Sequence, residues 1–263
     1  MFTTHQTASQ HIGSRTHQCD TTAYDENSVT GHRAWVLLDG IGDRLHTAIW
    51  VRAAALGLAQ TAAHLGDPGA AIRQIRPALR ATRATIGHPG DWPADAAAIV
   101  AVLTPAGRLY IAWAGDCRAY LAERGRANLL TVDHNKATQQ RREGRVPEAD
   151  AHDYLTSSLC FLTGRIDTVT VDFGPRSGVR RLLLASDGAY LPHERAGTLP
   201  PPSPDGTPRH RDGSGVPAPV LADGTPEAVA ERLTNLAVKS PHGGDNATAM
   251  VIDLLVGAHS TRT

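Results

Sequence analysis

The chain has 263 residues, of which 41% are hydrophobic, and this favours one large domain with a sizeable core over two small ones. Its 26 basic and 26 acidic residues give a formal net charge of zero, so no overall field attracts nucleic acid or an anionic membrane, and we expect neither as a partner. The 3 cysteines lie far apart without a CxxC pair, which argues against a disulfide framework and a thiolate zinc site.

The first residues, MFTTHQTASQHIGSRTHQ, are polar and contain no apolar stretch of signal-peptide length. No later run approaches the roughly 18 apolar residues that a membrane span needs. We therefore expect a soluble, cytoplasmic protein. Residues 1–14 show no periodicity, and we expect them to form a flexible N-terminus.

The next part of the chain predicts a buried strand followed by two helices. The apolar run Ala34–Asp39 stops at a glycine, as a buried strand does. Residues 46–65 are rich in Ala and Leu and predict a helix that Gly66-Asp67-Pro68 ends. A second helix is expected over about residues 69–86, where Pro77 should bend or break it.

After residue 95 the hydrophobic pattern changes to that of strands. Residues 96–104 and 108–114 are apolar, and Pro105-Ala106-Gly107 joins them as in a hairpin. Further strands are expected over 118–122 and 129–131, as a continuation of the same meander, and over 180–186 and 247–255; further helices are expected over 133–143, with Asp133 as its N-cap, and over 227–238.

Hairpin-linked strands flanked by pairs of helices indicate an antiparallel α+β sandwich rather than a wound parallel sheet. Residues 194–226 are rich in Pro and Gly with little to bury, and we expect them to be a flexible surface insertion. The expected organisation is a single domain over 15–257 with that insertion, followed by a C-terminal tail over 258–263.

Aspartates stand where apolar runs stop or begin: Asp39, Asp116, Asp187 and Asp245. A carboxylate at a strand end is held by a rigid element and still reaches solvent, and converging carboxylates repel one another unless a cation lies between them. Oxygen ligands favour Mg²⁺ or Mn²⁺ over zinc. A single Asp-Gly pair is more often a plain turn, as the pairs at 205, 212 and 223 in the insertion warn.

The ordered set of motifs resembles the PPM (type 2C) metal-dependent serine/threonine protein phosphatases over nearly the whole chain. The matching text is Arg15 with Asp20, DGIG from residue 39, GDCRAYL from 115, LTVDHN from 130, LLLASDG from 182 and GGDNATAMVIDL from 243. The resemblance implies two packed antiparallel β-sheets flanked by helices on both outer faces, an α-β-β-α sandwich with its metals at one end.

The resemblance also implies roles for individual residues. Asp39 would bridge two cations, with Asp187 and Asp245 completing the first site. The carbonyl of Gly40 and the carboxylate of Asp20 would contribute to the second. The remaining implied roles are a third, weaker metal site at Asp116, phosphate binding by Arg15, and orientation of its neighbour by Asn246.

The activity implied is hydrolysis of phosphoserine or phosphothreonine on proteins by a hydroxide bridging two Mn²⁺ or Mg²⁺ ions. Arginine suits the phosphate role because its planar fork donates two hydrogen bonds at once. The implied partner is a phosphorylated protein substrate, the implied role lies in signalling, and a monomer is expected.

Several positions depart from the family pattern. Cys19 stands where an acidic residue is usual, and Ile41 stands where some members carry a histidine that protonates the leaving group. Asp43 replaces a glycine, which would strain a backbone with positive φ, and Cys117 replaces a serine. These departures leave open a pseudophosphatase that acts as a binding or regulatory module. A second alternative is a metal-dependent hydrolase of small phosphate esters.

Overall fold

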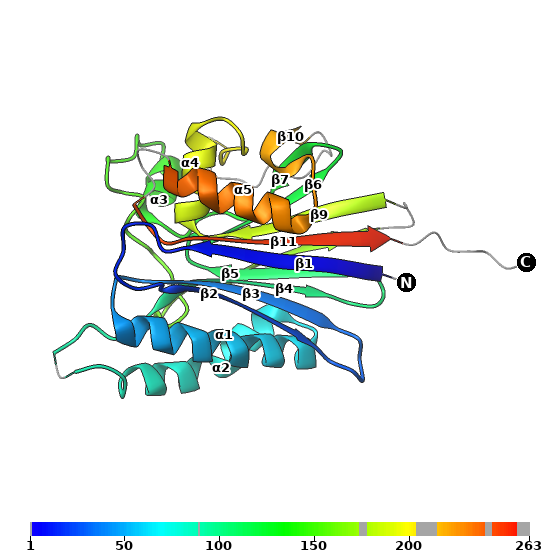
Figure 1. Cartoon of the computed structure of the whole chain (residues 1–263). Helices are drawn as coiled ribbons and strands as arrows, with labels where there is room; N and C mark the ends of the chain where they lie inside the picture. The colour runs from blue at the N-terminus through cyan, green and yellow to red at the C-terminus, as the bar shows by residue number, and fades with distance from the viewer. Residues whose placement is uncertain (1, 89, 174–177, 204–214, 240–243, 257–263) are drawn as a thin grey trace, which may run out of the picture.

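The computed structural model describes residues 2–88, 90–173, 178–203, 215–239 and 244–256. Two antiparallel sheets lie face to face, with α1 (Leu45–Leu65) and α2 (Pro68–Arg83) against one outer face and α4 (Asp187–Arg195) and α5 (Pro226–Lys239) against the other (Figure 1). The predicted α-β-β-α sandwich is confirmed. None of the helices in these ranges is long and apolar enough to cross a membrane.

The two sheets are built from strands that are distant in the sequence. The five-stranded sheet has the order β2 (Asp20–Glu26), β3 (Arg33–Gly40), β4 (Ala96–Leu103), β5 (Arg108–Ala114) and β8 (Asp167–Asp172). The six-stranded sheet has the order β1 (Phe2–His11), β11 (Ala247–Val256), β9 (Gly178–Ala185), β6 (Arg118–Glu123), β7 (Arg126–Leu129) and β10 (Val216–Pro217). The shorter helices are α3 (Lys136–Arg142) and the 3-10 turn η1 (Pro219–Leu221).

Strand β3 shows why the layers form. Its side chains alternate between two faces, as in any strand. Trp35 and Leu37 enter the core between the sheets, whereas Val36 and Leu38 enter the core under α1. All of these side chains are fully buried. A strand that is apolar on both faces needs a layer on each side, and the sandwich supplies it.

The boundary between α1 and α2 follows the predicted signals. Gly66 ends α1 in the left-handed conformation with φ 68°, and the Asp67 side chain caps α2 by accepting a hydrogen bond from the N–H of Ala70 at 2.9 Å. Pro77 lies inside α2, which continues unbroken to Arg83. The expected break is therefore absent, and α2 packs mainly against α1, with further contacts to β4 and β5.

The N-terminus is the main correction to the predicted organisation. Residues 1–14 were expected to be flexible, but Phe2–His11 form β1, which pairs along its whole length with β11. The domain therefore begins before residue 15. In β1 the polar composition reflects an edge strand, whose backbone bonds to one neighbour only.

Two further expectations were wrong. Strands β6 and β7 do not continue the meander of β4 and β5, because the chain crosses at residues 115–117 to the other sheet. Asp133 does not cap a helix: Asn135 does, by accepting a hydrogen bond from the N–H of Thr138 at 2.9 Å. Within the expected insertion at 194–226, β10 and η1 are regular elements, while residues 204–214 and the expected tail at 258–263 lie outside the described residues.

Candidate metal centre

Strand ends bring the predicted aspartates together at one end of the sandwich. Asp20 opens β2 and lies directly opposite Asp39, near the end of β3. Asp116 lies in the crossing between the sheets, Asp187 opens α4 and Asp245 lies two residues before the start of β11. We call these five residues the carboxylate cluster. Residues separated by most of the chain thus share one site, as the sequence motifs predicted.

Two glycines allow the strand ends to approach so closely. A Cβ on Gly188 would lie 2.1 Å from the carbonyl oxygen of Asn246, and one on Gly40 would lie 2.6 Å from that of Cys19. Either contact is impossible for a real side chain. Glycine after Asp39 and after Asp187 is therefore required by the packing of neighbouring backbone, which in turn sets the positions of both carboxylates.

A cleft of about 890 Å³ opens over the cluster. Its lining includes Asp39, Asp116, Asp187 and Asp245, together with Gly40 and Arg15. Asp20 lies behind Asp39, only 2% exposed, and its Oδ2 accepts a hydrogen bond from the Ser186 hydroxyl at 2.7 Å. Sequence reasoning missed Ser186, although it stands directly before the aspartate of the Ser-Asp-Gly motif.

The cluster brings together more carboxylates than the basic side chains beside them can neutralise. Burial, and then repulsion by Asp20, raises the pKa of Asp39 well above its ordinary value. Burial also raises the pKa of Asp20 to about 7 and that of Asp187 to about 6, with nearby aspartates adding to both. The pKa of Asp116 is likewise raised well above its usual range by burial and by Asp187. The site therefore favours a bound cation.

Arg15 supplies the positive side chain at this end of the cleft. Its Nη2 donates to Oδ2 of Asp245 at 2.7 Å, and both side chains are partly exposed. Asp43 fixes the loop that carries it: the Asp43 carboxylate accepts hydrogen bonds from the N–H groups of Thr16 at 2.8 Å and His17 at 2.7 Å. These bonds, that of Thr16 first, lower the pKa of Asp43 to about 2.

The structure also resolves the concern about strain at position 43. Positive φ falls on Gly42, with φ 97°, whereas the single non-glycine residue with positive φ in the described ranges is Arg124. Asp43 is thus an anchor for the loop, not a strained substitute for glycine. Its carboxylate adds contacts that a glycine could not make.

Asn246 and Cys19 join the two sheets beside the cluster. The Asn246 side chain accepts a hydrogen bond from the N–H of Cys19 at 2.7 Å and donates to the carbonyl of Ile12 at 2.9 Å, while its own N–H donates to Oδ1 of Asp245. This last contact comes from the backbone, whereas the side chain of Asn246 bonds Cys19 and Ile12, so the orienting role expected for Asn246 stays a prediction. Cys19 is fully buried, with its Sγ toward the Arg44 carbonyl, and supplies no ligand in place of the usual acidic residue.

The donor set fits hydrated Mg²⁺ or Mn²⁺. Among the residues that the structure describes, no three His, Cys, Asp or Glu side chains are arranged to hold one ion jointly. Mg²⁺ commonly keeps several waters and binds through one or two carboxylates, so a closed protein cage is not required. Oxygen-only donors with raised pKa values, open to a cleft, match this mode of binding. Asp39, Asp187 and Asp245 all line the cleft and would be the residues to hold such cations.

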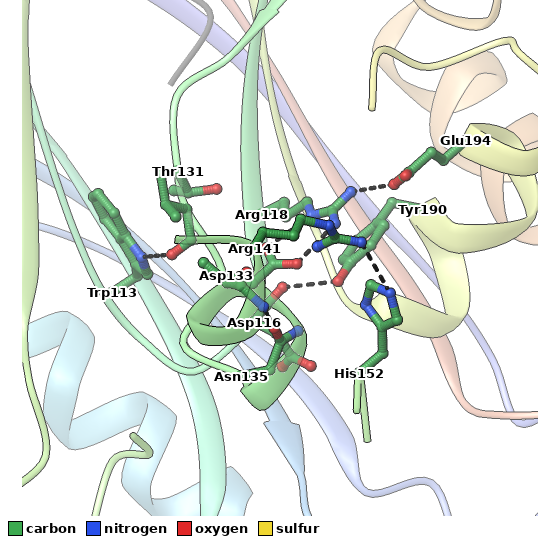
Figure 2. A network of polar contacts seen from close by, with 12 residues as sticks. Trp113, Asp116, Arg118, Thr131, Asp133, Asn135, Arg141, His152, Tyr190 and Glu194 are labelled. Atoms are coloured by element: carbon green, nitrogen blue, oxygen red, sulfur yellow. Dashed lines mark hydrogen bonds and ion pairs between the residues drawn. The ribbon is translucent and has the colours of Figure 1, made fainter. Parts of the chain in front are cut away.

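A second polar cluster lies behind Asp116, and sequence reasoning did not assign it. Arg118 is 1% exposed and donates to both oxygens of Asp133, at 2.9 and 2.8 Å, and to Glu194 (Figure 2). Its guanidinium also lies 3.9 Å from the centre of the Tyr190 ring, and the Tyr190 hydroxyl donates to the carbonyl of Asp116 at 3.0 Å. We call these four side chains (Arg118, Asp133, Tyr190 and Glu194) the Arg118 network.

The Arg118 network connects the two elements that carry cluster residues. Tyr190 belongs to α4, which Asp187 opens, and Arg118 opens β6, two residues after Asp116. Asp116 and Asp187 are therefore held by one buried set of contacts. The signal in the sequence was the pairing of Gly-Asp-x-Arg with Thr-x-Asp-His, because the arginine of one motif binds the aspartate of the other.

Comparisons with known proteins agree with this geometry. The family model described as protein phosphatase 2C matches residues 39–150. A curated relative, the serine/threonine protein phosphatase PstP of Mycobacterium tuberculosis, is 30% identical over 243 residues, which is 89% of this chain. The chain spans only 43% of the length of that relative.

Solved structures share the fold over nearly the full chain. A serine/threonine phosphatase from S. agalactiae superposes with a TM-score of 0.74 at 18% identity, covering 95% of this chain and 99% of that one. The catalytic domain of PstP in complex with 2 manganese ions superposes with a TM-score of 0.69 at 22% identity, covering 97% of this chain and 100% of that one.

Proposed function

The chain belongs to the protein phosphatase 2C (PPM) family, and from this premise we propose that it hydrolyses phosphoserine or phosphothreonine on proteins with two Mn²⁺ or Mg²⁺ ions. One observation carries the proposal: Asp39 and Asp245, from distant parts of the chain, line the same cleft together with Arg15. A cleft that joins an excess of carboxylates to an arginine suits a phosphate ester and the cations that accompany it.

In this proposal, different residues of the cleft bind the phosphate and the cations. The partly exposed guanidinium of Arg15 is positioned to bind phosphoryl oxygens, and Asp43 holds its loop in place. Asp39, Asp187 and Asp245 would hold the cations, with Asp116 also lining the cleft and Asp20 lying opposite Asp39 on the neighbouring strand. When bound, the cations supply an activated water and neutralise the phosphoryl charge.

The test is a phosphatase assay on a phosphothreonine peptide with Mn²⁺. Asp39→Asn and Asp187→Asn should each abolish the Mn²⁺-dependent activity, and EDTA should do the same to the unaltered protein. Asp223→Asn is the matched control, because Asp223 belongs to an exposed Asp-Gly pair that does not line the cleft. Turnover that persists in both cluster variants and in EDTA would rule out the proposal.

A pseudophosphatase is the second candidate, and the Arg15–Asp245 ion pair favours it. This pair places Arg15 on a carboxylate that the enzyme would use for a cation, and Cys19 provides no acidic side chain beside it. Calorimetric titration with Mn²⁺ separates the candidates. Binding of a metal pair that Asp39→Asn removes supports the enzyme, whereas absence of binding supports the scaffold.

A further inference from the structure

The cleft contains an unusual group of exposed apolar side chains. Five of its lining residues are large, hydrophobic and well exposed: Ile41 (48%), Trp92 (82%), Tyr154 (56%), Phe161 (45%) and Leu162 (82%). We call them the apolar rim. Single exposed apolar residues need no explanation, but a group gathered in one concave site is typical of a binding surface.

The backbone beneath the rim is firmly held although its side chains are exposed. Two arginines of α2 donate to the loop that carries Phe161 and Leu162: Arg76 binds the carbonyls of Leu159 at 2.9 Å and Gly164 at 3.0 Å, and Arg80 binds that of Cys160 at 3.0 Å. Asp95 adds a hydrogen bond from the N–H of Cys160 at 2.9 Å. The loop is therefore preorganised, which lowers the entropy cost of binding.

The other parts of the rim are anchored in the same way. The carbonyl of Trp92 hydrogen-bonds the His46 ring at 3.2 Å, that of Tyr154 accepts from the N–H of Lys136 at 2.9 Å, and the N–H of Ile41 donates to the carbonyl of Asp95 at 2.9 Å. Each anchor uses backbone atoms and leaves the apolar side chain in the cleft. This is the arrangement expected of a surface that awaits a ligand.

Charged groups of the cleft are already paired near the rim. Arg44 binds Asp91 at 3.0 Å, and Arg83 binds Asp95 at 3.2 Å. The rim therefore offers apolar contact without a free guanidinium from either residue, and the carboxylate of Asp153 also lines the cleft. Acidic side chains of a ligand would compete with Asp91 and Asp95 for these two guanidinium groups, whereas apolar side chains would bury surface.

We propose that the apolar rim binds large apolar side chains that flank the phosphorylated residue of a polypeptide substrate. This inference rests on the proposed function, because the rim and the carboxylate cluster share one cleft and a phosphoryl group at the cluster places its flanking residues along the rim. The volume of about 890 Å³ lies near the upper end of the roughly 300–1,000 Å³ that holds drug-sized ligands, and so accommodates more than one side chain.

The experiment compares two phosphothreonine peptides of equal length, one with Leu and Phe on both sides of the phosphothreonine and one with Ser and Gly there. With Mn²⁺, kcat/KM should be about tenfold higher for the apolar peptide, because partial burial of one or two such side chains is sufficient for that ratio. Trp92→Ala and Leu162→Ala should each reduce the preference, and the double variant should bring it close to one.

Leu56→Ala is the matched control, because Leu56 is 59% exposed on α1 and does not line the cleft. It should leave the preference unchanged. Equal kcat/KM values for the two peptides with the unaltered protein would overturn the inference, as would a preference that persists in the double variant. Size-exclusion chromatography completes the test: a dimer that the double variant converts to monomer would assign the rim to a second copy of the chain instead.

Two further measurements keep this inference apart from the proposed function. Turnover of acetyl-phosphothreonine amide, which has no flanking side chains, tests hydrolysis alone. Affinities of fluorescently labelled versions of both peptides test the rim alone. Without any turnover, tighter binding of the apolar peptide would still support the rim, and equal affinities would refute it.

Discussion

The carboxylate cluster and the Arg118 network are neighbouring polar sites that differ in whether their buried carboxylates are paired with basic side chains. In the network, the two carboxylate oxygens of Asp133 accept hydrogen bonds from Nε and Nη2 of Arg118, and both side chains are at most 2% exposed. In the cluster, Asp20, Asp39, Asp116 and Asp187 form no ion pair with a basic side chain in the described part of the chain. Asp245 alone has such a partner, in Arg15.

This difference separates a structural site from one that needs a further component. A buried carboxylate that is paired and hydrogen-bonded is complete within the fold. Carboxylates that share a site without a partner take up protons or cations, as their raised pKa values indicate. Tyr190 links the two sites through the Asp116 carbonyl. The Arg118 network, whose charges are paired, can therefore hold the carboxylate cluster, whose charges are mostly unpaired, in position.

The largest expected effect concerns the Arg118 network, in which the buried charges are paired. Arg118→Ala removes the partner of Asp133 and leaves a buried carboxylate uncompensated, and this should lower the free energy of unfolding by about 3–5 kcal/mol. Urea unfolding followed by circular dichroism measures it. Arg52→Ala, on the exposed face of α1, is the control and should stay within about 0.5 kcal/mol. A loss below about 1 kcal/mol for Arg118→Ala would break the comparison.

The next effect concerns the carboxylate cluster, in which most of the carboxylates have no basic partner. At a Mn²⁺ concentration of 100 times the dissociation constant, the folded protein should gain about 2.7 kcal/mol of stability. Asp39→Asn should abolish most of this gain. In EDTA, the same variant should unfold at a temperature equal to or above that of the unaltered protein, because it removes one of several repelling charges. A variant that is clearly less stable in EDTA would show that Asp39 is compensated after all.

The smallest effect concerns Asp43, a carboxylate compensated by backbone N–H groups instead of a cation. Asp43→Ala should free the loop of Arg15 and lower kcat/KM for a phosphopeptide by about tenfold, mainly through KM, since hydrogen bonds to a charged group are lost. The stabilisation by Mn²⁺ should remain. Asp43→Asn, which keeps one acceptor oxygen, should show a smaller loss; equal rates for all three proteins would contradict the positioning role.

The pH dependence of the Asp43 contacts follows from the direction of its pKa shift. Because the pKa of Asp43 is lowered in the folded protein to about 2 from an ordinary value of 3.8, its contribution to stability is complete above about pH 4. It is lost as the pH falls toward 2. Titration of Asp43 therefore does not shape the activity profile near neutral pH.

Elements with a strong apolar period could be predicted from the sequence. Helix α1 and strand β3 were recognised within one residue of their observed ends, since each buries a nearly continuous apolar stretch. Strands β1, β2 and β8 were missed because each lies at an edge of its sheet or exposes one face, so their sequences are largely polar. Polar alternation is a weak signal without knowledge of the neighbouring strand.

The carboxylate cluster could be predicted because its aspartates follow or precede apolar runs, and strand ends meet at sheet edges. The partners of those aspartates could not. Asp133 and Asn135 are both good helix caps by residue type, and only the position of Arg118 decides that Asp133 forms an ion pair. Asp43 looked like a source of strain until the loop of Arg15 was seen to lie against it. Both cases depend on contacts between segments that are distant in sequence.

The pairing of β1 with β11 has a consequence for protein synthesis. During translation β1 leaves the ribosome well before its hydrogen-bonding partner β11, which follows only after most of the described domain has been made. Because its side chains are mostly polar, β1 exposes little apolar surface until β11 is made. The loop of Arg15 is tied to the same late segment through Ser14 with Gly244 and through Asn246 with Ile12 and Cys19. The arginine proposed to hold phosphate therefore reaches its final position only when β11 has emerged, and in a nascent chain that stops short of β11 this loop lacks the contacts that fix it.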